Sequence, residues 1–181
     1  LLMKRILIIL GVIAAVVLVG LFSLRSWTKS ASPEAIAEVN QGGLKIKVDY
    51  CQPYKKGRKI FGGLVPYGKV WRTGANEATV IEFDQNVIAA GQPLDKGEYS
   101  LWTIPSQDGW IAIFNSETGQ WGTNYDQTKD VLRVPIISRK HSPMAEQFYI
   151  SFSPSANGTD MILAWDQTEA VVPIQKRGNN E

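Results

Sequence analysis

The sequence is poor in the residues that build covalent cross-links, transition-metal sites and hydrolytic triads. It contains one cysteine, Cys51, and one histidine, His141. These counts exclude an internal disulfide and a cysteine-rich zinc site. The complete G-x-S-x-G and G-x-x-x-x-G-K-[ST] patterns of nucleophile elbows and phosphate-binding loops are also absent. We therefore expect a surface histidine, a buried inert thiol, and no catalytic residue, metal or cofactor.

The chain also lacks a real excess of positive charge. Its formal net charge is +2, but four of its nineteen Lys and Arg residues flank an apolar run at the N-terminus. The remaining fifteen stand against seventeen Asp and Glu residues, so the rest of the chain is slightly acidic. The sequence pI of about 8.6 is therefore no argument for nucleic-acid binding.

The apolar run Ile6–Leu24 contains no charged residue, and cations lie on both sides of it. Its nineteen residues would span about 28 Å as a helix, close to the hydrocarbon thickness of a bilayer. We expect residues 1–25 to form an uncleaved, single-pass anchor in the cytoplasmic membrane, with the rest of the chain outside the cytoplasm. The alternative is a signal peptide cleaved near Ser30-Ala31-Ser32, which would leave a periplasmic or secreted protein.

A linker is predicted over residues 26–42, and a β-rich domain over 43–181. In "LKIKVDY" the apolar residues Leu44, Ile46, Val48 and Tyr50 alternate with polar ones, which predicts a half-buried antiparallel strand. Seven further short strands are predicted, namely "TVIEF", "EYSLWTI", "WIAIF", "VLRVPII", "QFYISF", "MILAW" and "AVVPI". Many short strands separated by turn signals favour an all-β fold, an antiparallel two-sheet sandwich or jelly roll.

Two segments interrupt the strand pattern, and long loops in compact domains are usually functional or mobile. The first, residues 53–79, carries six of the domain's cations and only one acid. Arginine presents a planar fork to carboxylates and phosphates, and a neighbouring tryptophan adds a stacking surface. The candidate ligand-binding residues in this loop are Arg58, Trp71, Arg72, Asn76 and Glu77.

The second segment, residues 115–130, combines aromatic, amide and carboxylate groups. Such a set suits a sugar, because an aromatic ring covers its apolar face while polar groups bind its hydroxyls. The candidate binding residues here are Trp121, Asn124 and Tyr125. A single site made from both loops requires that they lie at the same end of the domain.

These patterns favour a non-enzymatic module that binds a carbohydrate or an anionic ligand of the bacterial envelope. One alternative is a hydrolase of envelope glycans or esters, with Glu77 or Asp126 as acid or base; Asp130 and Asp166 are further candidates. The other alternative is a structural or assembly domain that binds another protein.

Several motifs resemble one family of exported bacterial proteins. They are "GRKIFGGLVPYGKVWRTGANEAT", "GEYSLWTIP", "W-x-x-IFN", "QWGTNYD" and "DVLRV". The family is catalogued as domain of unknown function twenty-nine eleven, and the resemblance covers roughly residues 32–174. It implies a single β-rich domain behind an export signal, and it makes residues 57–79 a family signature. The resemblance implies no established activity, substrate or cofactor. Members typically start with an ordinary signal peptide, whereas this apolar run is long enough to stay in the membrane.

Overall fold

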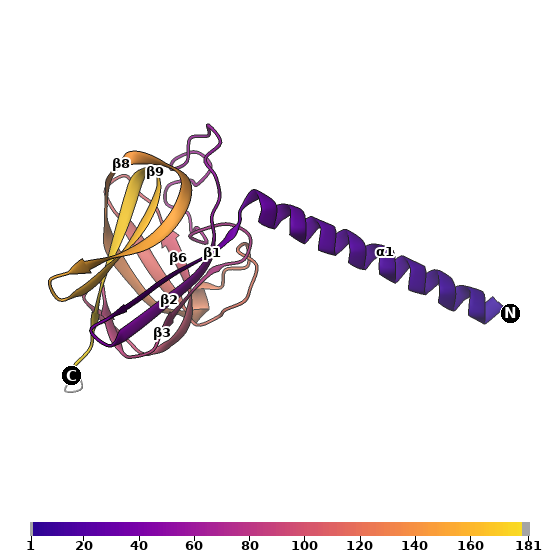
Figure 1. Ribbon diagram of the computed structural model, residues 1–181, viewed down its shortest axis with the longest axis horizontal. Helices are drawn as coiled ribbons and strands as arrows, with labels where there is room; N and C mark the ends of the chain where they lie inside the picture. Colours follow the sequence, from indigo (N-terminus) through magenta and orange to yellow (C-terminus); the bar gives the residue numbers. More distant parts are fainter. Residues whose placement is uncertain (1, 179–181) are drawn as a thin grey trace.

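The computed structural model describes residues 2–178, which form one long helix followed by a β-rich domain (Figure 1). Helix α1 (Leu2–Ala31) extends away from the domain, and its apolar segment is not buried against it. The mean hydropathy of its most apolar stretch is 3.0. Thirty residues at about 1.5 Å each give a helix of about 45 Å, longer than a hydrocarbon core of about 30 Å. The helix has the length and composition of a membrane span or of a signal sequence.

Nine antiparallel strands form one sheet in the order β1-β2-β3-β6-β7-β8-β9-β4-β5. The strands are β1 (Glu34–Gln41), β2 (Leu44–Cys51), β3 (Thr79–Phe83), β4 (Val87–Ala89), β5 (Gln92–Leu94), β6 (Gly97–Ile104), β7 (Trp110–Asn115), β8 (Asp130–Ser155) and β9 (Gly158–Lys176). The predicted all-β, antiparallel class is confirmed. The two separate sheets of a sandwich or jelly roll are not seen, because the hydrogen-bonded order runs unbroken between the edge strands β1 and β5.

Strands β8 and β9 are long and bent, and each replaces two of the short strands that the sequence predicts. The pairing of β8 with β9 shifts register between Lys140 and Ala145 and again before Tyr149. Such irregularities bend a strand without ending it. The first part of β8 pairs with β7, and the end of β9 pairs with β4. Figure 1 shows the orange and yellow ribbons of β8 and β9 curving above the purple β1 and β2, and residues of β1 contact β8.

Residues 26–42 are not a linker, contrary to the prediction. Helix α1 continues to Ala31, and β1 begins only three residues later and pairs along its whole length with β2. On β1, Ala37 is buried while Ile36 is 61% exposed. An edge strand of this kind buries little apolar surface, so its alternating pattern is weak and resembles that of a linker.

One large hydrophobic core joins residues from all nine strands. The predicted inward face of β2 is confirmed, since Leu44, Ile46, Val48 and Tyr50 are all buried. The loop of residues 53–79 adds four buried side chains of its own to this core: Ile60, Phe61, Val65 and Trp71. This loop is therefore packed into the domain instead of being a mobile surface loop.

A second, smaller cluster explains why Ile113, on the other face of "WIAIF" from Trp110, Ala112 and Phe114, is buried too. Its buried members are Ala78, Trp102 and Ile113, and Tyr125 packs against them. The ring of Tyr125 lies 4.9 Å from that of Trp102, measured between centroids. The loop of residues 115–130 thus covers part of β6 and β7 and holds Tyr125 as a packing residue.

Candidate functional site

The two predicted loops lie against one another, as a combined site requires. The Gly122 amide donates to the Asn76 carbonyl at 2.9 Å, and the Ala78 amide donates to the Gln120 carbonyl at 3.1 Å. Glu77 and Trp121 form an isolated antiparallel bridge between these two bonds. These contacts meet the condition for a combined site, that the two loops lie at the same end of the domain.

The backbone around Arg72 is held in an unusual shape. Thr73 and Asn76 both have positive φ, at 52° and 61°, which residues with a side chain rarely adopt. The Thr79 hydroxyl donates to the Thr73 carbonyl at 2.7 Å, and the hydroxyls of Thr73 and Thr103 lie 3.1 Å apart. Such conformations persist only where the surrounding structure enforces them, and they are common at binding sites.

A cavity of about 320 Å³ lies beside this backbone. Four predicted site residues, Arg58, Trp71, Arg72 and Asn76, line it together with Trp165. Of the eleven lining residues, none is acidic. The cavity is therefore a basic, partly aromatic pocket.

Arg72 is half-buried and has no carboxylate partner within the described part of the chain. One guanidinium nitrogen donates to the Asn76 carbonyl at 3.3 Å. Burial lowers the pKa of Arg72, but an arginine remains protonated in proteins. A half-buried cation without a counter-ion is costly, because removal from water is not offset by an opposite charge. An anion in the cavity would supply that charge.

Arg58 is more exposed and is held by backbone groups. Its Nε donates to the Lys55 carbonyl at 2.9 Å and Nη2 donates to the Tyr54 carbonyl at 2.5 Å. In residues 2–178 it forms no ion pair. These bonds fix the direction of its side chain and leave part of the guanidinium available to a ligand.

Trp165 is a cavity residue that sequence reasoning missed. Its side chain is 1% exposed, and its Nε1–H has no hydrogen-bond partner among the described residues. Trp71 is also buried, but its Nε1 donates to the Gly74 carbonyl at 3.1 Å. Buried donors are nearly always paired, so an unpaired one beside a cavity suggests a missing acceptor. In the sequence Trp165 only ends an apolar strand, and nothing there reveals an unpaired donor.

The other predicted residues do not line this cavity. Tyr125 donates from its hydroxyl to Asp130 at 2.6 Å, and burial together with this bond raises the pKa of Tyr125. The Asn124 side chain accepts a bond from Thr123 at 3.2 Å. Trp121 is 40% exposed. The cavity residues thus come from the first loop, from β9 and from Ser32 directly after α1, and the second loop contributes support through its backbone.

A family model described as "Protein of unknown function (DUF2911)" matches residues 32–174. The chain belongs to the DUF2911 family. The match begins directly after α1, so it covers the β-rich domain and leaves the apolar helix outside. No curated protein and no solved structure matches the chain.

The carboxylates of the DUF2911 domain that would serve a hydrolase are all paired with other groups. Glu77 forms ion pairs with Arg25 at 3.3 Å and Lys29 at 3.5 Å, both on α1. Asp126 caps the short helix Gln127–Lys129, and its hydrogen bonds from Thr128 lower the pKa of Asp126. Asp130 pairs with Arg133 and Asp166 with Lys55, at 2.9 Å and 3.6 Å.

His141 and Cys51 have structural surroundings. The prediction of a surface histidine is wrong, because His141 is half-buried. Its Nδ1 lies 2.7 Å from Glu169 and its Nε2 lies 3.2 Å from the Tyr149 hydroxyl. Cys51 is buried as predicted, and burial raises the pKa of its thiol. Within residues 2–178, no three His, Cys, Asp or Glu side chains form a group that could hold a metal ion.

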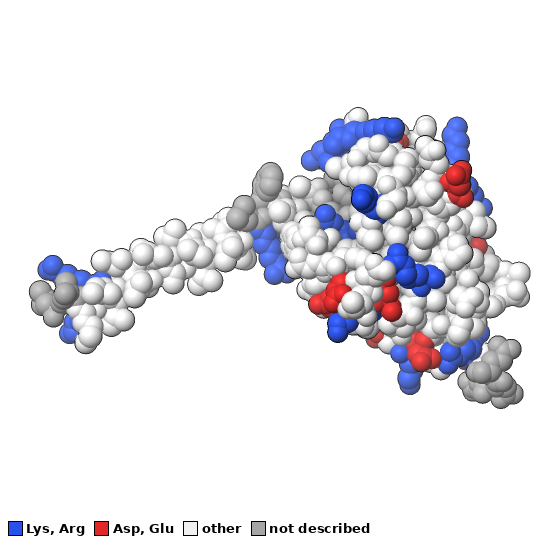
Figure 2. Space-filling view, turned by 180° about the vertical axis from the view of Figure 1, so that it is seen from behind, with Lys and Arg blue, Asp and Glu red and all other residues white. Residues whose placement is uncertain are grey.

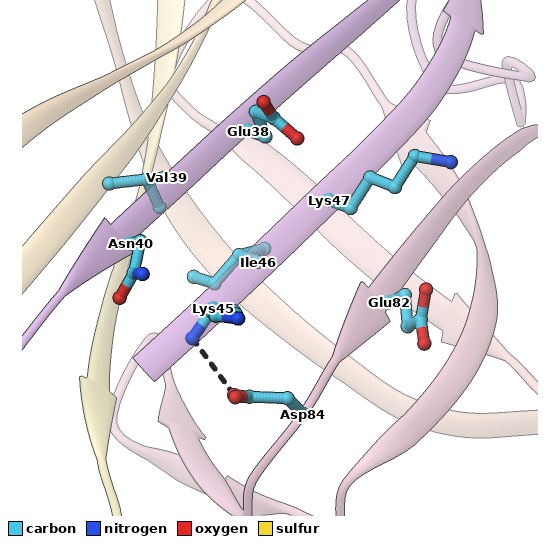
Figure 3. Close-up of a pocket in the computed structure, with 8 residues that line it drawn as sticks. All are labelled: Glu38, Val39, Asn40, Lys45, Ile46, Lys47, Glu82 and Asp84. Atoms are coloured by element: carbon cyan, nitrogen blue, oxygen red, sulfur yellow. Dashed lines mark hydrogen bonds between the residues drawn. The ribbon is translucent and has the colours of Figure 1, made fainter. Parts of the chain in front are cut away.

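A larger concavity of the DUF2911 domain lies elsewhere, over β1, β2 and β3 (Figure 3). Its volume is about 560 Å³, and its charged residues are mixed in sign, with Lys45 and Lys47 facing Glu38, Glu82 and Asp84. The Asp84 carboxylate is already bonded to the Lys45 amide at 2.8 Å. This groove therefore lacks the unbalanced charge that the cavity at Arg72 has.

Figure 2 shows basic side chains prevailing at the upper end of the domain, where the loop of residues 53–79 rises in Figure 1.

Proposed function

We propose that the DUF2911 domain of this chain is a non-enzymatic module that binds an anionic ligand in the cavity at Arg72. The observation that carries this proposal is the half-buried guanidinium of Arg72, without a carboxylate partner in the described chain, in a cavity that is also lined by Trp165, whose Nε1–H is unpaired among the described residues. Both groups donate hydrogen bonds, and a phosphate or carboxylate accepts them. The absence of acidic residues from the cavity lining supports an anion over a cation.

The ligand class follows from the donors. Arg58, Arg72 and the Asn76 amide offer several N–H groups around one small volume, which matches the oxygens of a phosphate, sugar phosphate or dicarboxylate. A neutral carbohydrate is favoured less, because Trp121, Asn124 and Tyr125 lie outside the lining. A hydrolase with paired carboxylates is favoured less for the same cavity, which has no carboxylate in its lining.

The proposal places this domain outside the cytoplasm, held at the membrane by α1. The supporting features are the apolar helix at the front of the chain and the direct passage from Ala31 into β1. A ligand of the bacterial envelope fits this location.

The proposal is tested by a thermal-shift screen of the full chain in detergent micelles. The panel contains inorganic phosphate, sulfate, sugar phosphates, dicarboxylates and neutral oligosaccharides. A ligand at about 100 times its dissociation constant adds about 2.7 kcal/mol to the free energy of unfolding. We expect anions to raise the melting temperature and neutral sugars to have no effect.

The matched variants are Arg72→Gln, which removes the cation from the cavity, and Lys69→Gln, which removes an exposed cation from the same loop. We expect the shift to disappear in the first variant and to persist in the second. An equal loss in both variants would show that the anions act on overall charge and not in the cavity. A panel without any anion-dependent shift would contradict the proposal.

A further inference from the structure

We infer that Trp121 and Ile36 form a membrane-facing surface that rests in the lipid headgroup layer and fixes the orientation of the domain. The inference rests on the proposed location at the membrane, but it does not require an anion in the cavity. Its partner is the polar boundary of a bilayer.

The first step concerns where the helix leaves the hydrocarbon. The uncharged run ends at Leu24, and Arg25 is the first charged residue after it. Arg25 to Ala31 adds about 10 Å of helix. A headgroup layer is about 5–7 Å thick, taking a bilayer of about 40–45 Å around a core of about 30 Å. The first strand of the domain therefore starts just outside the headgroup layer.

The second step concerns how the domain is attached. The Glu77 carboxylate lies 3.3 Å from Arg25 and 3.5 Å from Lys29. The Asn76 amide is 3.5 Å from the carbonyls of Thr28 and Ser32. Because Glu77 reaches the first charged residue after the apolar run, this part of the domain lies level with the headgroups.

The third step places Trp121 there. Trp121 and Glu77 are opposite one another in an antiparallel bridge, and side chains of such a pair lie on the same face, with Cβ atoms about 4.5–5.5 Å apart. The Glu77 side chain faces α1, so the Trp121 side chain lies on the α1 side too. Trp121 is 40% exposed. Tryptophan is enriched at membrane–water boundaries because its ring is apolar and its N–H is polar.

The fourth step adds a neighbouring apolar residue. A groove of about 460 Å³ between the end of α1 and the β-domain is lined by Ile36 and by charged residues of both signs: Arg25, Lys29, Glu34, Asp49 and Glu77. Ile36 lies on the edge strand β1 and is 61% exposed. Ile36 lines the same groove as Arg25, Lys29 and Glu77, and Trp121 pairs with Glu77. Two exposed apolar side chains thus lie near this charged cluster, a composition that suits a boundary between lipid and water.

The test uses the full chain in phosphatidylcholine vesicles, with and without bromine on the acyl chains near the headgroups. Bromine quenches tryptophan emission at that depth. The difference between wild type and Trp121→Phe isolates the emission of Trp121, because the other five of the six tryptophans are present in both. We expect the brominated lipid to remove most of this difference signal and acrylamide in the water to remove little.

A second variant tests the attachment. Glu77→Gln removes the ion pairs to α1, so we expect Trp121 to lose its quenching by brominated lipid and to become accessible to acrylamide. Glu82→Gln, which changes an exposed carboxylate on β3, should leave both unchanged. If Trp121→Phe fails to fold, Ile36→Trp gives a new emission at an exposed position, with the same expectation.

Vesicle flotation separates the possible failures. A chain that floats with the vesicles but whose Trp121 and Ile36→Trp emissions respond only to acrylamide would overturn the inference and leave the proposed location intact. A chain that does not float would overturn both. Neither result bears on anion binding, which the melting temperature reports separately.

Discussion

At the scale of single residues, Gly122 is required by space. A Cβ atom at this position would lie 2.2 Å from Arg72 Cδ and 2.7 Å from the Asn76 carbonyl oxygen. Real Cβ atoms do not approach so closely, and the second contact is with backbone that cannot rotate away. Gly122 therefore allows the two loops to touch and sets the position of Arg72.

We expect Gly122→Ala to lower the free energy of unfolding by about 1–3 kcal/mol, the usual cost of overpacking. It should also abolish the anion-dependent thermal shift, because Arg72 must move. Urea denaturation measures the first effect. The matched control is Gly178→Ala, which has open space around it. In an Arg72→Ala background the substitution should cost less, since one of the two clashes is gone; an unchanged cost would contradict this account.

Glu169 gives a prediction for pH. Burial raises the pKa of Glu169, but hydrogen bonds from Arg139 and His141 outweigh burial and hold the pKa below its ordinary value. A carboxyl group with a lowered folded pKa stabilises the protein above its unfolded pKa of about 4.3, and this stabilisation is lost as the pH falls through the folded pKa.

Wild type should therefore lose more stability on acidification below about pH 4.3 than Glu169→Gln does. Urea denaturation at a series of pH values provides the measurement, with the exposed Glu117→Gln as control. Parallel stability curves for wild type and Glu169→Gln would show that Glu169 keeps an ordinary pKa in the folded protein.

At the scale of elements, the loop of residues 53–79 packs side chains into the hydrophobic core and also lines the cavity. Phe61 is 7% exposed and packs edge-on against Trp71 and Trp110, with ring centroids 5.9 Å and 4.7 Å apart. Leu64, three residues later, is 47% exposed. The same loop thus contains a core residue and a surface residue of similar size.

We expect Phe61→Ala to cost about 3–5 kcal/mol of unfolding free energy, as for a core aromatic residue. Leu64→Ala should change it by no more than about 0.5 kcal/mol, as for a surface site. Chemical denaturation of both variants measures these changes in the free energy of unfolding. A small effect of both would mean that the loop is a mobile appendage.

Strands with strong apolar–polar alternation or a continuous apolar run can be predicted from the sequence. Strands with weak alternation, or with an irregularity that resembles a turn, cannot. β2, β3, β6 and β7 follow their predicted segments because each buries a full face. β1 was missed because Ala37 is its only fully buried residue. Each of β8 and β9 was predicted as two short strands. The residues at the register shifts near Ala145 and at the bend at Asp166 have the sequence pattern of turns, although the strands continue through them.

The candidate site, too, could be predicted from the sequence only in part. Arg58, Arg72 and Asn76 were predicted together because cations and glycines cluster in one segment, and the structure brings them to one cavity. Trp165 was not predicted because it comes from β9, far away in the sequence. The pairing of Glu77 with α1 was equally hidden, because it depends on how the helix meets the domain.

At the scale of the whole molecule, the cavity and the end of α1 are neighbours. Ser32, directly after α1, lines the cavity, and Asn76 contacts both the cavity and the end of α1. A ligand that enters beside Arg72 is thus bound near the point where the chain would meet the membrane. This arrangement fits a module that holds an anionic ligand of the envelope close to the bilayer.

The measurement that tests this account most directly follows the indole N–H resonances of the six tryptophans by NMR during titration with the best anion from the thermal screen. The full chain is labelled with ¹⁵N in detergent micelles, and Trp165→Phe assigns the peak. The account predicts that the Trp165 resonance shifts and saturates, and that it does not move in Arg72→Gln. A ligand that raises the melting temperature while the Trp165 resonance stays in place would contradict the account.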